Sequence, residues 1–271
     1  MTTRSFQRVA PRRARSRFVR SRAGDRPGRC SIRRRALCAP FLSLTVGLAA
    51  LGWTGCTLVA HSEPRAQAAG HESADAHAPR SAGVARLVEG NARFVSGHTQ
   101  HPRQDPDRRT ELASGQQPFA VIVGCADSRT APELLFDQGL GDLFVVRVAG
   151  NVVDDHALGS IEYAVEHLHS GLIVVLGHER CGAVAAARDT VAAHGHAEGH
   201  IDSLVAAIRP AVEATAGQDA EATCLANVQN TVQALRSSEP ILRHMLEAGQ
   251  VTVVGAHYDL DTGLVTFTSE P

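Results

Sequence analysis

Two short segments of the sequence carry side chains that bind transition metals. Cys125 follows one apolar run, and His178 and Cys181 follow another. Thiolate and imidazole ligands favour Zn²⁺, and three protein ligands leave one position of a tetrahedral zinc open for water. A lone Cys after a strand is more often a small buried hydrophobic residue. Because both segments end neighbouring predicted strands, we interpret Cys125, His178 and Cys181 as the ligands of a catalytic zinc.

Asp127 and Arg129 lie two residues apart, directly after Cys125. On a turn the two side chains can pair, which keeps the carboxylate ionised and oriented. An exposed ion pair contributes little by itself, but an oriented carboxylate beside a metal-bound water can accept its proton. We favour the functional interpretation because this segment borders the predicted zinc site. Cys224 is a weaker candidate for a fourth, structural ligand, since no other ligand type lies near it in the sequence.

The elements that must position these residues alternate between strands and helices. Continuous apolar runs predict strands buried on both faces, and helical stretches separate them. The predicted strands are Phe119–Gly124, Leu143–Val148, Leu172–Leu176, Val251–Gly255 and a short one near Val265; the predicted helices are Gly83–Val95, Ala131–Asp137, Ala157–Leu168, Gly182–Ala193, Leu225–Leu235 and Glu239–Ala248. The alternation indicates an α/β fold with a mainly parallel β-sheet flanked by helices. Ligands of such sheets collect beyond the carboxyl ends of the strands, where Cys125, Gly150 and His178 lie.

The charge of the chain is unevenly distributed. The formal net charge is −1, and all 27 basic residues are Arg, of which 13 lie in residues 1–35 with Asp25 as the only acid. From residue 61 onward, 14 Arg stand against 27 Asp and Glu, a net charge of −13. An acidic domain repels phosphate, which excludes nucleic acid as a partner. A content of 44% hydrophobic residues excludes a disordered chain.

The N-terminal part has the features of an export segment. We divide the chain into a basic region (1–35), a hydrophobic signal or anchor segment (36–68), a linker (69–82) and one folded domain (83–271). A basic region, an apolar run and the small-residue site Ala66-Gln67-Ala68 are typical of a cleaved signal. Arg34-Arg35 resembles a twin-arginine signal, which predicts export of the folded protein to an extracellular, periplasmic or cell-surface location. An uncleaved anchor, or a lipoprotein cleaved before Cys56, would instead give membrane contact through this segment alone.

The two metal-binding segments together resemble a known signature. Cys125-x-Asp127-Ser128-Arg129, followed by His178-x-x-Cys181-Gly182, is similar to the motif pair of the β-class carbonic anhydrases, here a bacterial one with an export signal. The similarity extends in order from about Gly83 to Phe267. It also covers Gln116-x-Pro118, Arg147-x-Ala149-Gly150-Asn151, Ser160-Ile161-Glu162-Tyr163-Ala164-Val165, Gly177-His178 and Gly255-Ala256-x-Tyr258.

This resemblance implies roles for single residues. Cys125, His178 and Cys181 would bind one zinc per chain, which Asp127 would join only in a closed form of the site. Asp127 and Arg129 would form the catalytic dyad, and Gln116 and the backbone N–H of Gly182 would bind bicarbonate or CO₂. The family's fold, a parallel-centred sheet working as a homodimer or larger homo-oligomer, agrees with the strand pattern.

The implied reaction is the reversible hydration of CO₂ to bicarbonate and a proton, by attack of zinc-bound hydroxide on CO₂ assisted by the Asp127–Arg129 dyad. Two other functions fit parts of the sequence. A zinc-binding or zinc-buffering protein without catalysis would use the His-rich stretch 194–200 with His61, His71 and His77. A zinc hydrolase of another small carbonyl compound is the second. Metal storage requires neither Asp127 nor Arg129, so the intact dyad favours catalysis.

Overall fold

The computed structural model of the chain describes residues 80–268. The predicted export segment and most of the predicted linker lie outside these residues, so export stays a prediction. Within the described part, no helix has the length and apolar character needed to cross a membrane.

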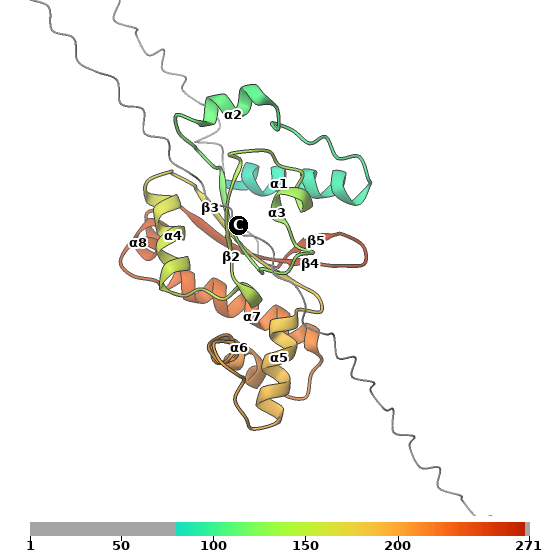
Figure 1. Cartoon of the computed structure of the whole chain (residues 1–271). Helices are drawn as coiled ribbons and strands as arrows, with labels where there is room; N and C mark the ends of the chain where they lie inside the picture. Colours follow the sequence, from blue (N-terminus) through green and yellow to red (C-terminus); the bar gives the residue numbers. More distant parts are fainter. Residues whose placement is uncertain (1–79, 269–271) are drawn as a thin grey trace, which may run out of the picture. The chain divides into compact units, whose positions relative to one another are not determined.

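A five-stranded sheet forms the centre of the described part (Figure 1). Its strands are β1 (Ala120–Gly124), β2 (Leu143–Arg147), β3 (Leu172–His178), β4 (Thr252–Tyr258) and β5 (Val265–Phe267), arranged in the order β2-β1-β3-β4-β5. The first four strands are parallel, and β5 runs antiparallel to β4. The predicted α/β fold with a mainly parallel sheet is therefore confirmed. Because Gly124 of β1 lies beside Leu176 of β3, the carboxyl ends of these two strands meet at one edge.

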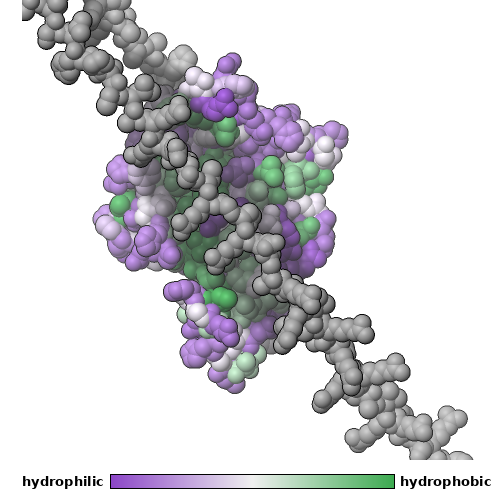
Figure 2. Space-filling view, viewed as in Figure 1, coloured by the Kyte–Doolittle hydropathy of each residue, from purple (hydrophilic) through white to green (hydrophobic). Residues whose placement is uncertain are grey.

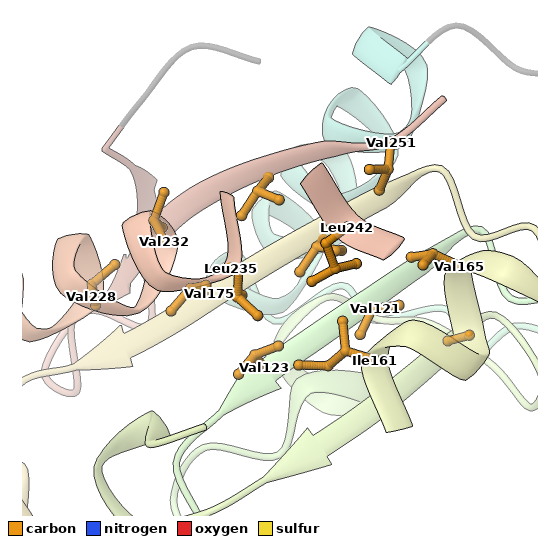
Figure 3. Packing of buried hydrophobic residues seen from close by; sticks show 13 residues of the cluster. Val121, Val123, Ile161, Val165, Val175, Val228, Val232, Leu235, Leu242 and Val251 are labelled. Carbon is orange, nitrogen blue, oxygen red and sulfur yellow. The ribbon is translucent and has the colours of Figure 1, made fainter. Parts of the chain in front are cut away.

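Helices cover both faces of the sheet. They are α1 (Arg80–Val95), α2 (Pro106–Leu112), α3 (Pro132–Leu135), the single-turn η1 (Ala149–Asn151), α4 (Asp155–Glu166), α5 (Gly182–Ala192), α6 (Ile201–Ala214), α7 (Ala220–Arg236) and α8 (Ile241–Glu247). One face packs against α4, α7 and α8, where Ile161, Val232 and Leu242 contact the strand valines (Figure 3). The other face packs against α1 and α3 through Leu87 and Leu135. Each fully buried Val, Ile or Leu contributes about 1.5–3 kcal/mol.

Two of the longer helices differ from the sequence-based expectation. No helix was predicted over residues 201–214, where α6 packs beside α5 (Figure 1). This helix begins after His200 without a capping side chain and contains Pro210, so the usual start signal is missing and a helix breaker is present. The second helix, α7, begins at Ala220 and not at Leu225, because the Asp219 side chain accepts a hydrogen bond from the N–H of Ala222.

Candidate metal centre

Three side chains meet at the carboxyl edge of the sheet. Cys125 directly follows β1, His178 is the last residue of β3, and Cys181 directly precedes α5. The Sγ atoms of the two cysteines are 4.0 Å apart, and the ligand atoms of all three residues lie within 4.8 Å of one another. All three side chains are buried. The structure therefore brings together the three residues that the sequence predicts as metal ligands.

One ring nitrogen of His178 is left free for a metal. Nδ1 lies 2.8 Å from the carbonyl oxygen of Glu179 and donates to it when it carries the ring proton. Nε2 is buried and has no hydrogen-bond partner within the described residues. A buried polar atom without a partner is costly. A metal ion held by Nε2 and the two sulfur atoms would satisfy it, with the Glu179 carbonyl orienting the ring.

The two thiols accommodate one negative charge readily and a second one with difficulty. The hydrogen bond from the Cys181 thiol, with smaller contributions from His178 and the Gly150 N–H, lowers the pKa of Cys125 to about 4 despite its burial. The same hydrogen bond, together with burial, raises the pKa of Cys181. Two adjacent buried thiolates repel each other, so both are ionised only when a cation lies between them. Two sulfurs and one imidazole nitrogen fit Zn²⁺ in particular.

The backbone of η1 supplies a further contact to the centre. The N–H of Gly150 donates to Sγ of Cys125 at 3.2 Å, and Nδ2 of Asn227 on α7 donates to the Gly150 carbonyl at 2.7 Å. Gly150 has a φ of 70°, and a Cβ atom there would lie 2.7 Å from Cδ1 of Ile208. The left-handed backbone therefore favours glycine here, and a larger residue would also have to displace the end of the Ile208 side chain on α6.

Asp127 and Arg129 form a two-point ion pair beside the three ligands. Nε and Nη2 of Arg129 donate to Oδ1 and Oδ2 of Asp127 at 2.9 and 2.8 Å, and the Arg129 backbone N–H donates to Oδ1 at 3.0 Å. The Arg129 guanidinium holds the pKa of Asp127 well below its usual range. Oδ2 lies 4.0 Å from Nε2 of His178. An ionised and oriented carboxylate therefore borders the metal-binding group.

Arg147, the last residue of β2, holds the loop that carries Cys125 and Asp127. Its Nε donates to the carbonyl of Cys125 at 2.9 Å, and its Nη2 donates to the carbonyl of Asp127 at 2.5 Å. The hydroxyl of Thr130 donates to the same two carbonyls. Arg147 was not among the predicted site residues. A charged residue at the end of an otherwise apolar strand was the signal that it has specific partners.

Gly182 and Gln116 lie at opposite ends of the strands, Gly182 at the carboxyl ends and Gln116 at the amino ends. Gly182 is the first residue of α5 and directly follows Cys181. Gln116 precedes β1, and the five residues of β1 span roughly 15 Å between the two ends. The structure therefore does not bring Gln116 to the metal centre of its own chain. It lies instead on a cleft of about 640 Å³ that is lined by Arg109, Leu112, Ser114, Leu140 and Gly141 among others.

Cys224 is buried in the same apolar cluster as Cys125 and Cys181. Within the described residues, however, it does not belong to the group of potential metal ligands. A second such group consists of Glu179, Asp259 and Asp261, of which Asp261 is exposed. The guanidinium group of Arg180 already pairs with Glu179 and Asp261. Neither group among the described residues includes the His-rich stretch 194–200.

Comparisons with known proteins agree with this geometry. Residues 120–265 match the family model described as carbonic anhydrase. Carbonic anhydrase 2 of Mycobacterium tuberculosis is 46% identical over 180 residues, which cover 65% of this chain and 87% of that protein. The carbonic anhydrase of Mycolicibacterium smegmatis is 43% identical over 188 residues, with coverages of 68% and 90%. Among solved structures, a tetrameric β-carbonic anhydrase of the ascomycete Sordaria macrospora aligns with a TM-score of 0.56 at 26% identity, covering 70% of this chain and 98% of that one.

Proposed function

Because this chain belongs to the β-class carbonic anhydrases, which hydrate CO₂ reversibly to bicarbonate and a proton, we propose a role for each residue around its metal centre. Cys125, His178 and Cys181 hold zinc. Bound zinc supplies a Lewis acid that lowers the pKa of a coordinated water, so that a nucleophile is available near neutral pH. The observation that carries the remaining roles is the Asp127 carboxylate, which Arg129 holds beside the three ligands.

Asp127 accepts a hydrogen bond from the attacking water and thereby directs a lone pair of its oxygen toward the carbon of CO₂. An ionised carboxylate is a stronger acceptor than a neutral carboxyl group, and the pair with Arg129 keeps Asp127 ionised. The two parallel hydrogen bonds from Arg129 also fix the plane of the carboxylate. Arg129 thus acts as a positioning residue, and Asp127 acts on the reacting water.

The backbone N–H of Gly182 donates to an oxygen of the substrate. It lies at the N-terminus of α5, a helix of 11 residues, where unpaired N–H groups and the helix dipole favour anions such as bicarbonate. Gly182 is exposed, and apart from its chain neighbours and its own helix a Cβ atom there would meet no atom within 4 Å. The surface beside this helix end is therefore open.

Gln116 binds substrate in the site of a second copy of the chain. It lies at the amino end of β1, too far from its own metal centre to contact a substrate there. Two features support an interface with a second copy: Leu134 and Leu140 are about half exposed, and β2 is an edge strand whose five residues are only partly buried. Figure 2 shows apolar surface among hydrophilic residues on the face drawn. We therefore propose a homodimer or larger homo-oligomer with shared sites.

A mixed dimer tests this sharing. Homodimers of the Gln116→Ala chain and homodimers of the Cys181→Ser chain are both expected to be weakly active. The activity of the Gln116→Ala homodimer should be about tenfold below that of wild type, because one hydrogen bond to the substrate is lost. Their heterodimer, isolated with two different tags, should recover close to half of the wild-type activity. In it, the zinc-binding site of the Gln116→Ala chain receives Gln116 from its partner. A heterodimer no more active than the Gln116→Ala homodimer would show that Gln116 does not act across an interface.

Removal of the metal separates catalysis from zinc storage. In a stopped-flow assay, the purified protein is expected to hydrate CO₂ with about one zinc per chain, to lose this activity on dialysis against a chelator, and to regain it on addition of zinc. A storage protein would bind zinc without the activity. A hydrolase of another small carbonyl compound would need the metal for that substrate and hydrate CO₂ poorly.

We also propose that the chain is exported through its N-terminal segment, which lies outside the described residues. The proposal rests on the basic region, the uncharged run and the small-residue site of the sequence. The amino-terminal sequence of the mature protein tests it, because an export signal, a lipid anchor and an uncleaved anchor each leave a different terminus.

A further inference from the structure

A largely buried histidine on the strand beside that of the ligand His178 has no role in the mechanism above. His257 lies in β4, and its side chain is 12% exposed. Its Nε2 is 2.8 Å from Oε1 of Glu221 in the first turn of α7. The two atoms lie at hydrogen-bond distance without the alignment of a hydrogen bond, and Nε2 has no other hydrogen-bond partner within the described residues. In the sheet, His257 lies beside Gly177, the residue that precedes the ligand His178.

One side of α7 connects this pair to the metal centre. Glu221, Cys224 and Asn227 are three residues apart, so they follow one another along one side of the helix. Cys224 packs with Cys125 and Cys181, and Asn227 holds the Gly150 carbonyl. Glu221 extends the same row by one turn, and its side chain is 39% exposed. The Glu221–His257 contact therefore lies between the buried centre and solvent.

The surroundings of the pair are rich in carboxylates. Glu179 after β3, Asp259 after β4 and Asp219 before α7 act on Glu221 or His257, as does His178. Burial raises the pKa of Glu221 and lowers the pKa of His257. The ordinary difference of about two units between a Glu and a His is therefore reduced, and a proton can pass between the two groups at a lower energetic cost.

We propose that His257 and Glu221 carry the proton released in each hydration from the metal centre to solvent. The imidazole accepts the proton, through water, and becomes an imidazolium. A small rotation of either side chain aligns Nε2–H with the Glu221 carboxylate, and the Nε2–H bond then breaks as the proton passes to that carboxylate, which becomes a neutral carboxyl group. Glu221 releases the proton to a buffer base, and exchange with water restores the ring tautomer. No other bond changes, and no oxidant or co-reactant is needed.

The kinetic test separates CO₂ conversion from proton release, because kcat/KM for CO₂ does not include the step that returns the proton to buffer. In His257→Ala and Glu221→Gln proteins, kcat is expected to fall about tenfold at low buffer concentration, with kcat/KM within twofold of wild type. Imidazole in the buffer should restore kcat of His257→Ala. The matched control is His244→Ala on α8, which removes an exposed His that also lies near a carboxylate, Glu239; it should change neither constant.

Two further readouts do not depend on turnover. Zinc content should stay at about one per chain in both variants. The imidazole NMR signal of His257 is assigned in the zinc-loaded protein as the signal that disappears in His257→Ala. In Glu221→Gln this signal should titrate at a lower pH than in wild type, because the neighbouring negative charge is gone. The proposal is overturned if kcat and kcat/KM fall together, if neither falls, if the loss of kcat persists in imidazole buffer, or if both His257→Ala and His257→Gln lose zinc.

Discussion

A Cys181→Ser protein is expected to lose zinc and CO₂ hydration together. The Cys181 thiolate is one of three buried ligands, and a neutral hydroxyl does not replace its charge. Removal of a group that only orients a metal ligand lowers metal affinity or activity by about 10–100-fold. Removal of a ligand itself should therefore lower the activity by more than about a hundredfold. Zinc per chain by atomic spectroscopy and stopped-flow hydration of CO₂ measure the two effects on the same sample.

Cys224→Ser is the matched control for this substitution. Cys224 is a free, buried thiol in the same apolar cluster, but it does not belong to the ligand group of the described residues. The control therefore makes the same atomic change in the same apolar cluster but outside the ligand group, and it should keep about one zinc per chain. Full zinc and activity in Cys181→Ser would refute the ligand assignment, and loss of zinc in Cys224→Ser alone would assign the fourth position to that thiol.

An Asp127→Asn protein is expected to keep its zinc and lose activity by about 10²–10⁴-fold, the range for a positioned group that handles a proton. Asn has nearly the same shape but no charge, and its NH₂ group donates where the carboxylate accepts. Because Asp127 is paired with Arg129 in the structure, zinc binding should not depend on it. Zinc content, circular dichroism and kcat/KM together distinguish this result from a folding defect.

Asp261→Asn serves as the control carboxylate. Asp261 also pairs with an Arg, namely Arg180, but both side chains are more than half exposed, and such pairs contribute little. Its removal should leave kcat/KM unchanged. An Arg129→Ala protein should show a loss in the same direction as Asp127→Asn, since the carboxylate then lacks its orienting partner. If Asp127→Asn hydrates CO₂ as fast as wild type, the proposed dyad is wrong.

Much of the fold could be predicted because its central strands, β1 and β3, are buried on both faces. Such strands need apolar side chains at every position, which leaves continuous runs such as Leu172–Leu176 in the sequence. The metal ligands could be predicted because Cys125, His178 and Cys181 directly follow two of these runs, and parallel strands bring their carboxyl ends to one edge. Helix α6 could not be predicted from its ends, since it lacks a capping residue, although the spacing of Val205, Ile208 and Val212 was a usable signal.

The sequence by itself thus determined the fold class, the zinc ligands and the membership of Asp127 and Arg129 in the site, because each depends on residue type and on short spacing along the chain. Only the tertiary structure decided how atoms from distant segments meet. It left Nε2 of His178 free, directed the Gly150 N–H at Cys125, and placed Gln116 at the far edge of the sheet. It also brought Glu221 against His257. The Gly150 and Glu221 contacts depend on how α7 packs against the carboxyl ends of the strands, and the local sequence pattern does not encode that packing.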